Sequence, residues 1–86
     1  MNGYSIRQGT VYRNKSDGSR LLLIHHDPMN MESIVVPGNE KSFDARHPAL
    51  ISIDSLIALR KSEQYEETGD LETECLAREL QRLLAG

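Results

Sequence analysis

The sequence contains no tryptophan, and its four aromatic residues are three tyrosines and one phenylalanine. A chain of 86 residues is long enough for one domain, and the scarcity of rings means that its core must be aliphatic. A domain of this size buries only about 60–65% of its unfolded surface, so its stability depends on close packing or on a core shared with another chain. Charged residues make up 27% of the chain, a share typical of a folded domain.

Cysteine is nearly absent too. The single cysteine, Cys75, excludes an internal disulfide and a cysteine-clustered zinc site. No apolar run approaches the roughly 18–20 residues that cross a bilayer. The first residues, MNGYSIRQG, lack the apolar core of a signal peptide. We therefore expect a cytoplasmic protein without a membrane segment.

A basic surface is also missing. The net charge is −3, with six lysines and arginines against five acids in residues 1–53 and four against eight in residues 54–86. Nucleic-acid binding depends on clustered positive charge, so a nucleic-acid partner is not expected. The acidic second half is better suited to a basic protein surface.

The first half has the pattern of short strands separated by turns. Asp17-Gly18 tolerates positive φ and predicts a β-hairpin, and Pro37-Gly38 fits a type II turn. The expected strands are TVYR (10–13), RLLLIHH (20–26), ESIVV (32–36), KSFD (41–44) and ALISI (49–53), with a sixth in YSIR (4–7) before a bend at Gly9. Five or six short strands predict a strongly bent sheet or a small barrel of SH3-like or OB-like topology.

The second half has helical patterns. Asp54 can cap a helix that begins SLIALRK, residues 61–70 are polar and acidic, and Gly69 is suited to a helix stop before Asp70 caps a second helix. We expect an α+β fold in which the strands are followed by two C-terminal helices. Residues 1–86 form one domain with a barrel-like part (3–53), a helix with an acidic connector (54–66) and an amphipathic helix (71–85).

The last helix has the clearest pattern. One stripe holds its apolar positions, Glu74 and Arg78 are spaced as an ion pair, and Cys75 lies on the opposite, partly exposed side. Fifteen residues are too few for a stable isolated helix, so the stripe must pack against the barrel, a second copy or a partner's groove. The stripe contains Thr73, Leu76, Ala77, Leu80, Leu83 and Leu84, and its four leucines are the predicted partner-binding residues.

Two adjacent histidines end the second predicted strand. Neighbouring side chains of a strand point to opposite faces, so His25 and His26 cannot bind one ion together. His25 and Asp27 share a face, and with His47 they form an alternative metal-binding set. We favour structural roles for these residues, with Met29 and Met31 as loop cover, and expect no metal and no cofactor.

Motifs of enzymes are absent: there is no nucleophile elbow, P-loop or His-Glu-x-x-His. Two fragments, GTVYR (9–13) and RHPALIS (46–52), resemble the Gly-x-x-Tyr and Arg-x-Pro-x-Leu strands of the MazF/PemK family of small-barrel endoribonuclease toxins over about a dozen residues. The resemblance implies RNA cleavage with Arg46, and with His47 near the scissile phosphate, so the alternative function is a ribonuclease or RNA-binding protein that uses these two residues. The favoured hypothesis is a non-enzymatic protein-interaction module, a regulator, adaptor or inhibitor of the kind common in bacteria and phages.

Overall fold

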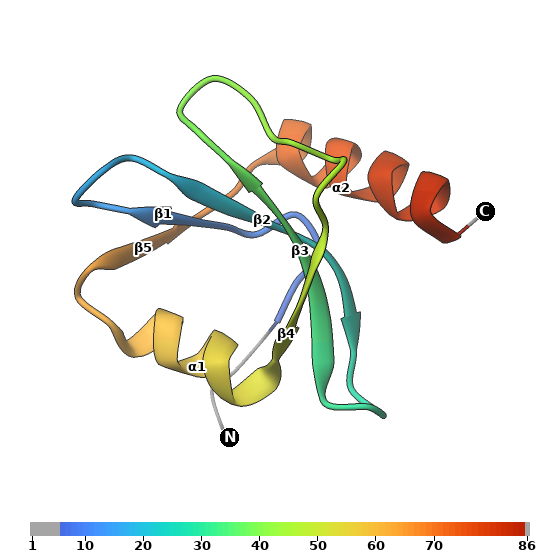
Figure 1. Ribbon diagram of the computed structural model, residues 1–86, viewed down its shortest axis with the longest axis horizontal. Helices are drawn as coiled ribbons and strands as arrows, with labels where there is room; N and C mark the ends of the chain where they lie inside the picture. Colours follow the sequence, from blue (N-terminus) through green and yellow to red (C-terminus); the bar gives the residue numbers. More distant parts are fainter. Residues whose placement is uncertain (1–5, 86) are drawn as a thin grey trace.

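The computed structural model describes residues 6–85 (Figure 1). Within that range the order of elements is β1 (Val11–Asn14), β2 (Arg20–Asp27), β3 (Glu32–Gly38), β4 (Ala49–Ser52), α1 (Ile53–Lys61), β5 (Tyr65–Thr68) and α2 (Leu71–Ala85). The predicted α+β class is confirmed. The two helices do not follow the strands as one block, because β5 lies between them.

The five strands form one antiparallel sheet in the order β4-β3-β2-β1-β5. The pairing of β2 with β3 shifts register between Leu23 and His25, which places a bulge beside Ile24. A bulge bends a strand and increases its twist, so the sheet curves strongly at this point.

The sheet is not closed, so the predicted SH3-like or OB-like barrel is not confirmed. Closure would require β4 to pair with β5, since these are the two edge strands. Helix α1 connects them directly in the chain, contacts both and spans the space between them (Figure 1). In a closed barrel the two edge strands would pair with each other, whereas here α1 lies between β4 and β5.

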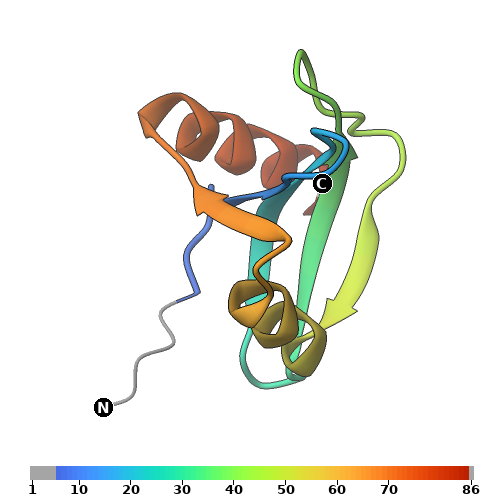
Figure 2. The ribbon, with the colours of Figure 1, turned by 90° about the vertical axis from the view of Figure 1, so that its left-hand side faces the viewer.

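Alternation along the strands gives the sheet two apolar faces, each covered by one helix. Figure 2 shows α2 and α1 on opposite sides of β1 and β5. Neighbouring residues of one strand therefore lie on different faces of the sheet, because side chains of a strand alternate between faces. Beneath α2 lie Val11, Leu22, Ile24 and Val36, packed with Ala77 and Leu80, whereas Tyr12, Leu23 and Val35 pack with Leu56 of α1.

The β1–β2 hairpin is confirmed, with Val11 opposite Leu22. The Asp17 carboxylate accepts from the Ser19 amide at 2.8 Å, and Gly18 has φ +78°. Both residues thus act as the sequence predicts, one by accepting a turn hydrogen bond and the other by adopting a left-handed conformation.

The turn predicted at Pro37-Gly38 is wrong, because both residues belong to β3 and pair with β2. Gly38 does not have the positive φ that a type II turn requires. The chain turns at Asn39, whose side-chain oxygen accepts from the amides of residues 41 and 42 at 2.7 and 3.0 Å. The strand predicted over 41–44 is reduced to a single bridge between Gly38 and Phe43.

The start of α1 differs by two residues from the prediction. Ser52, not Asp54, caps the helix, and its hydroxyl accepts from the Ser55 amide at 3.2 Å. Asp54 lies in the first turn, where its charge still complements the helix dipole. The strand predicted over 4–7 is not formed by Ile6 and Arg7, and its first half lies outside the described residues.

The polar and acidic segment 61–70 contains β5 (Tyr65–Thr68), a strand that the sequence did not predict. Tyr65 lies opposite Asn14, and Glu66 lies opposite Arg13 with an ion pair of 3.3 Å. Gly69 does not end a helix; with φ +150° it joins β5 to α2. The predicted cap of α2 is confirmed, because the Asp70 carboxylate accepts from the Thr73 amide at 2.9 Å.

Candidate functional site

Two adjoining hollows form a shallow groove between the C-terminal end of α2 and the outer face of β2, β3 and β4. The larger hollow is about 190 Å³ and the smaller about 60 Å³. Both are lined by His25 and Ile34, so they lie side by side. We call them the Ile34 groove; its lining further includes Ile24, Gln81 and Leu84 at one end and Asp27, Glu32, Ser33 and Leu50 at the other.

Strand register gathers these residues on one face. Ile34 of β3 lies between His25 of β2 and Leu50 of β4, directly opposite both. Asp27 lies opposite Glu32 one step further along the same face. Because every second residue of a strand shares a face, these five positions form one continuous surface.

Helix α2 covers only part of this face. Ala77 is fully buried and Leu80 is 8% exposed, whereas Leu83 is 75% exposed and Leu84 45%. Leu76 is half-buried beside the core. The four predicted partner-binding leucines therefore divide: one is in the chain's own core, one borders it, and two remain on the surface.

The far end of the groove is acidic. Asp27 and Glu32 stand opposite each other across the strand pair, an arrangement that is unfavourable for like charges. The Asn30 amide group donates to the Asp27 carboxylate at 2.6 Å, and this hydrogen bond lowers the pKa of Asp27 below its usual value. Within residues 6–85, neither carboxylate has a lysine or arginine in ion-pair distance.

The two histidines lie on opposite faces, as predicted. The His25 ring shares a hydrogen bond of 2.9 Å with the Gln81 amide of α2, and the His26 ring shares one of 2.9 Å with the hydroxyl of buried Ser33. Both rings therefore have structural partners.

The alternative metal set does not assemble. His47 lies in the β3–β4 loop and is bonded to Asp44, not to His25 or Asp27. No group of three potential ligands comes together in the described part of the chain. Met29 and Met31, predicted as loop cover, are instead 92% and 57% exposed at the β2–β3 turn. Cys75 is exposed, as predicted.

The β3–β4 loop holds a small polar cluster around Asp44. Its carboxylate lies 2.7 Å from the His47 ring nitrogen Nδ1 and 3.4 Å from Arg46 Nε. Both partners lower the pKa of Asp44, with the His47 hydrogen bond contributing most. The Arg46 side chain is 88% exposed and that of His47 72%.

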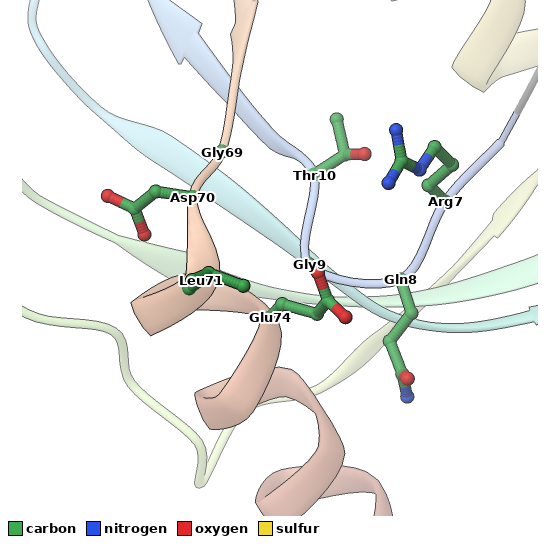
Figure 3. A pocket seen from close by; sticks show the side chains of 8 residues that line it. All are labelled: Arg7, Gln8, Gly9, Thr10, Gly69, Asp70, Leu71 and Glu74. Atoms are coloured by element: carbon green, nitrogen blue, oxygen red, sulfur yellow. The ribbon is translucent and has the colours of Figure 1, made fainter.

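A third hollow, of about 280 Å³, lies at the start of α2 (Figure 3). Arg7 and Asp70 lie on opposite sides of the turn at Gly9 in this view. A Cβ at Gly9 would come within 2.6 Å of the Glu74 Cα, so only glycine allows the turn to approach the helix. The Thr73 hydroxyl donates to the Gly9 carbonyl at 2.9 Å. At this hollow the turn at Gly9 therefore packs against the start of α2 and holds the helix in place.

Sequence reasoning missed Ile34, Leu50 and Glu32 as site residues. Alternation within the third and fourth strands places Ile34 and Leu50 on one face each, but only the register of β3 with β4 makes them neighbours. The exposure of Leu50, 67%, follows from its place on an edge strand.

No family model, curated protein or solved structure matches this chain. The likeness of residues 9–13 and 46–52 to ribonuclease toxins is therefore not extended by any wider match. Neither helix in residues 6–85 is long and apolar enough to span a membrane.

Proposed function

We propose that this protein is a non-enzymatic protein-interaction module, a regulator, adaptor or inhibitor that docks through the Ile34 groove and the last turn of α2. The observation that carries the proposal is the clustering of exposed leucines at one end of the molecule. Leu84 lines the groove with 45% of its surface exposed, Leu50 lines the opposite end, and Leu83, which precedes Leu84 in the last turn of α2, is 75% exposed. Exposed apolar side chains gathered around one groove favour an interaction site.

The size of the groove favours protein side chains over a small molecule. Small-molecule sites usually enclose about 300–1,000 Å³, and the two hollows hold about 190 and 60 Å³. The larger hollow has the size of one or two apolar side chains, and the smaller one admits only part of a side chain. The His25–Gln81 hydrogen bond connects β2 to α2 at the α2 end of the groove and holds that wall in place.

Affinity capture with matched variants tests the proposal. Leu83 and Leu71 are 75% and 78% exposed at opposite ends of α2, so Leu83→Asp and Leu71→Asp each place one carboxylate on the surface of the same helix without entering the core. We expect a protein captured by the wild type and by Leu71→Asp to be lost with Leu83→Asp. Equal capture by the three proteins would contradict the proposed site.

The Asp44 cluster supports a second candidate function, RNA cleavage. A carboxylate that orients a histidine, 2.7 Å away, is the arrangement of a general base, and Arg46 beside it can stabilise a phosphate. We expect His47→Ala and Arg46→Ala to abolish cleavage of RNA by the purified chain, with Lys41→Ala in the same loop as the control. If the wild type cleaves no RNA, this candidate is wrong.

A further inference from the structure

The Ile34 groove specifies the chemistry of its occupant. Apolar lining from Ile34, Leu50 and Leu84 requires apolar side chains, and the facing acids Asp27 and Glu32 require a cation beside them. Asp27 already accepts hydrogen bonds from its own turn, which leaves Glu32 as the acid with free acceptor capacity. The occupant therefore carries one or two large aliphatic side chains next to a lysine or arginine.

The chain itself presents such a segment. The last turn of α2 places Arg82 beside Leu83 and Leu84. Arg82 is exposed and has no carboxylate in ion-pair distance among residues 6–85, and Leu83 is 75% exposed. A basic and aliphatic protrusion thus adjoins an acidic and aliphatic groove on the same molecule.

We infer that the partner of the Ile34 groove is a second copy of this chain, in a two-fold symmetric dimer. In this dimer Leu83 of each copy packs over Ile34 and Leu50 of the other, and Arg82 pairs with Glu32 across the interface. Leu84, which lines the groove and also belongs to the protruding turn, lies near the two-fold axis. The inference rests on the proposed function, whose docking surface it assigns to a particular partner.

The pairing can be symmetric because the last turn of α2 and the Ile34 groove lie next to each other on the same chain. In an isologous interface the contact made by one copy is repeated by the other, so the last turn of α2 and the groove that receives it must belong to the same surface patch of each chain. Here Leu84 belongs to both. The groove cannot be filled by its own α2, because Ala77 and Leu80 hold that helix on the core of the same chain.

Charge reversal in the purified full-length chain tests this pairing by sedimentation equilibrium. Glu32→Arg and Arg82→Glu each place like charges at both symmetric contacts, so we expect each variant alone to dimerise about 10- to 100-fold more weakly than the wild type. An equal mixture of the two variants restores opposite charges at both contacts of a heterodimer, and we expect near wild-type dimerisation. Leu71→Asp is the control and should dimerise like the wild type.

Circular dichroism of each variant establishes that it is folded. If either charge variant is unfolded, Leu83→Asp replaces it as the single variant, and dimerisation like the wild type overturns the inference. A wild type that is monomeric up to its solubility limit also overturns it, as does a wild-type dimer in which the mixed charge variants show no recovery. A monomer that still captures another protein in a Leu83-dependent way rejects the second copy and retains the proposed function.

Discussion

Glu32 stands opposite Asp27 at the end of the β2–β3 pair, and both side chains are half-buried. Like charges at directly opposed positions destabilise an antiparallel pair by about 0.2–1 kcal/mol. Asp27 has a local reason to be acidic, since it accepts hydrogen bonds from the amides of residues 29 and 30 in the turn. Glu32 has no such hydrogen bond in the described range. Its charge therefore opposes the isolated fold and favours a cationic partner.

Replacing Glu32 with glutamine separates these two effects. We expect Glu32→Gln to stabilise the monomer by about 0.2–1 kcal/mol in urea unfolding at low protein concentration, while weakening association. Glu63→Gln, at an exposed turn position, is the control and should change stability little. A loss of stability in Glu32→Gln would show that the repulsion is absent.

Tyr12 is 1% exposed, and burial together with the charge of Glu67 opposite it raises its pKa to about 12. The folded chain then holds this proton more tightly than the unfolded chain, whose tyrosine pKa is about 10. The stabilisation is complete below pH 10 and is lost as the pH rises through 12.

The pH dependence of unfolding measures this shift. Between pH 10 and pH 12 we expect the wild type to lose about 2 kcal/mol more stability than Tyr12→Phe, which has no phenol proton to release. The difference between the two proteins cancels the titration of lysines and of the other tyrosines. Parallel curves across this range would mean that Tyr12 ionises normally in the folded state.

Helix α2 combines a structural face and a surface face in one element. Ala77 and Leu80 pack on the core with Val36 and Leu22, while Leu83 points away from it. The sequence left open whether the stripe packs on its own sheet or on another chain; in the structure Ala77 and Leu80 are buried on the sheet, whereas Leu83 and Leu84 stay on the surface. The last turn is therefore available for contacts with another chain.

Alanine substitutions at Leu80 and Leu83 test whether the first side chain is in the core and the second is on the surface. We expect Leu80→Ala to cost about 2–5 kcal/mol, the usual range for a buried leucine, and Leu83→Ala to change stability by less than about 0.5 kcal/mol. Urea unfolding monitored by circular dichroism at low protein concentration measures both. Similar losses in the two variants would mean that Leu83 is buried within its own chain.

Strand β5 shows what periodicity cannot detect. Its sequence, YEET, has one apolar residue and no alternation, and it is held by backbone pairing with β1 and by ion pairs such as that between Arg60 and Glu67 at 3.0 Å. These partners are distant in the chain or belong to another element. Local pattern therefore assigns the segment to a connector, although the sheet needs it as an edge strand.

Amide exchange distinguishes a strand from a connector at this point. The Lys15 amide donates to the Gln64 carbonyl at 2.8 Å, and hydrogen-bonded pairs alternate along an antiparallel ladder. We therefore expect the amides of Glu66 and Thr68 to exchange slowly and that of Glu67 to exchange rapidly. Rapid exchange at all three would contradict the pairing of β5 with β1.

At the scale of the whole molecule, sequence pattern predicted the parts but not their assembly. The hairpin around Gly18 and the helix capped by Asp70 depend on neighbouring residues, so local chemistry was sufficient for both. The open sheet depends on where α1 lies between two edge strands, and the groove depends on the register that places Ile34 beside Leu50. Such non-local pairings leave no periodic signal in one sequence.

The central claim is that one end of the molecule, the last turn of α2 with the adjoining sheet face, is an interface. Methyl NMR over a dilution series, and then with any captured partner, tests it most directly. We expect the methyl resonances of Ile34, Leu50, Leu83 and Leu84 to shift with concentration or on partner addition, while those of Leu71 and buried Leu56 remain constant. Constant resonances at the first four residues, with changes elsewhere or nowhere, would contradict the account.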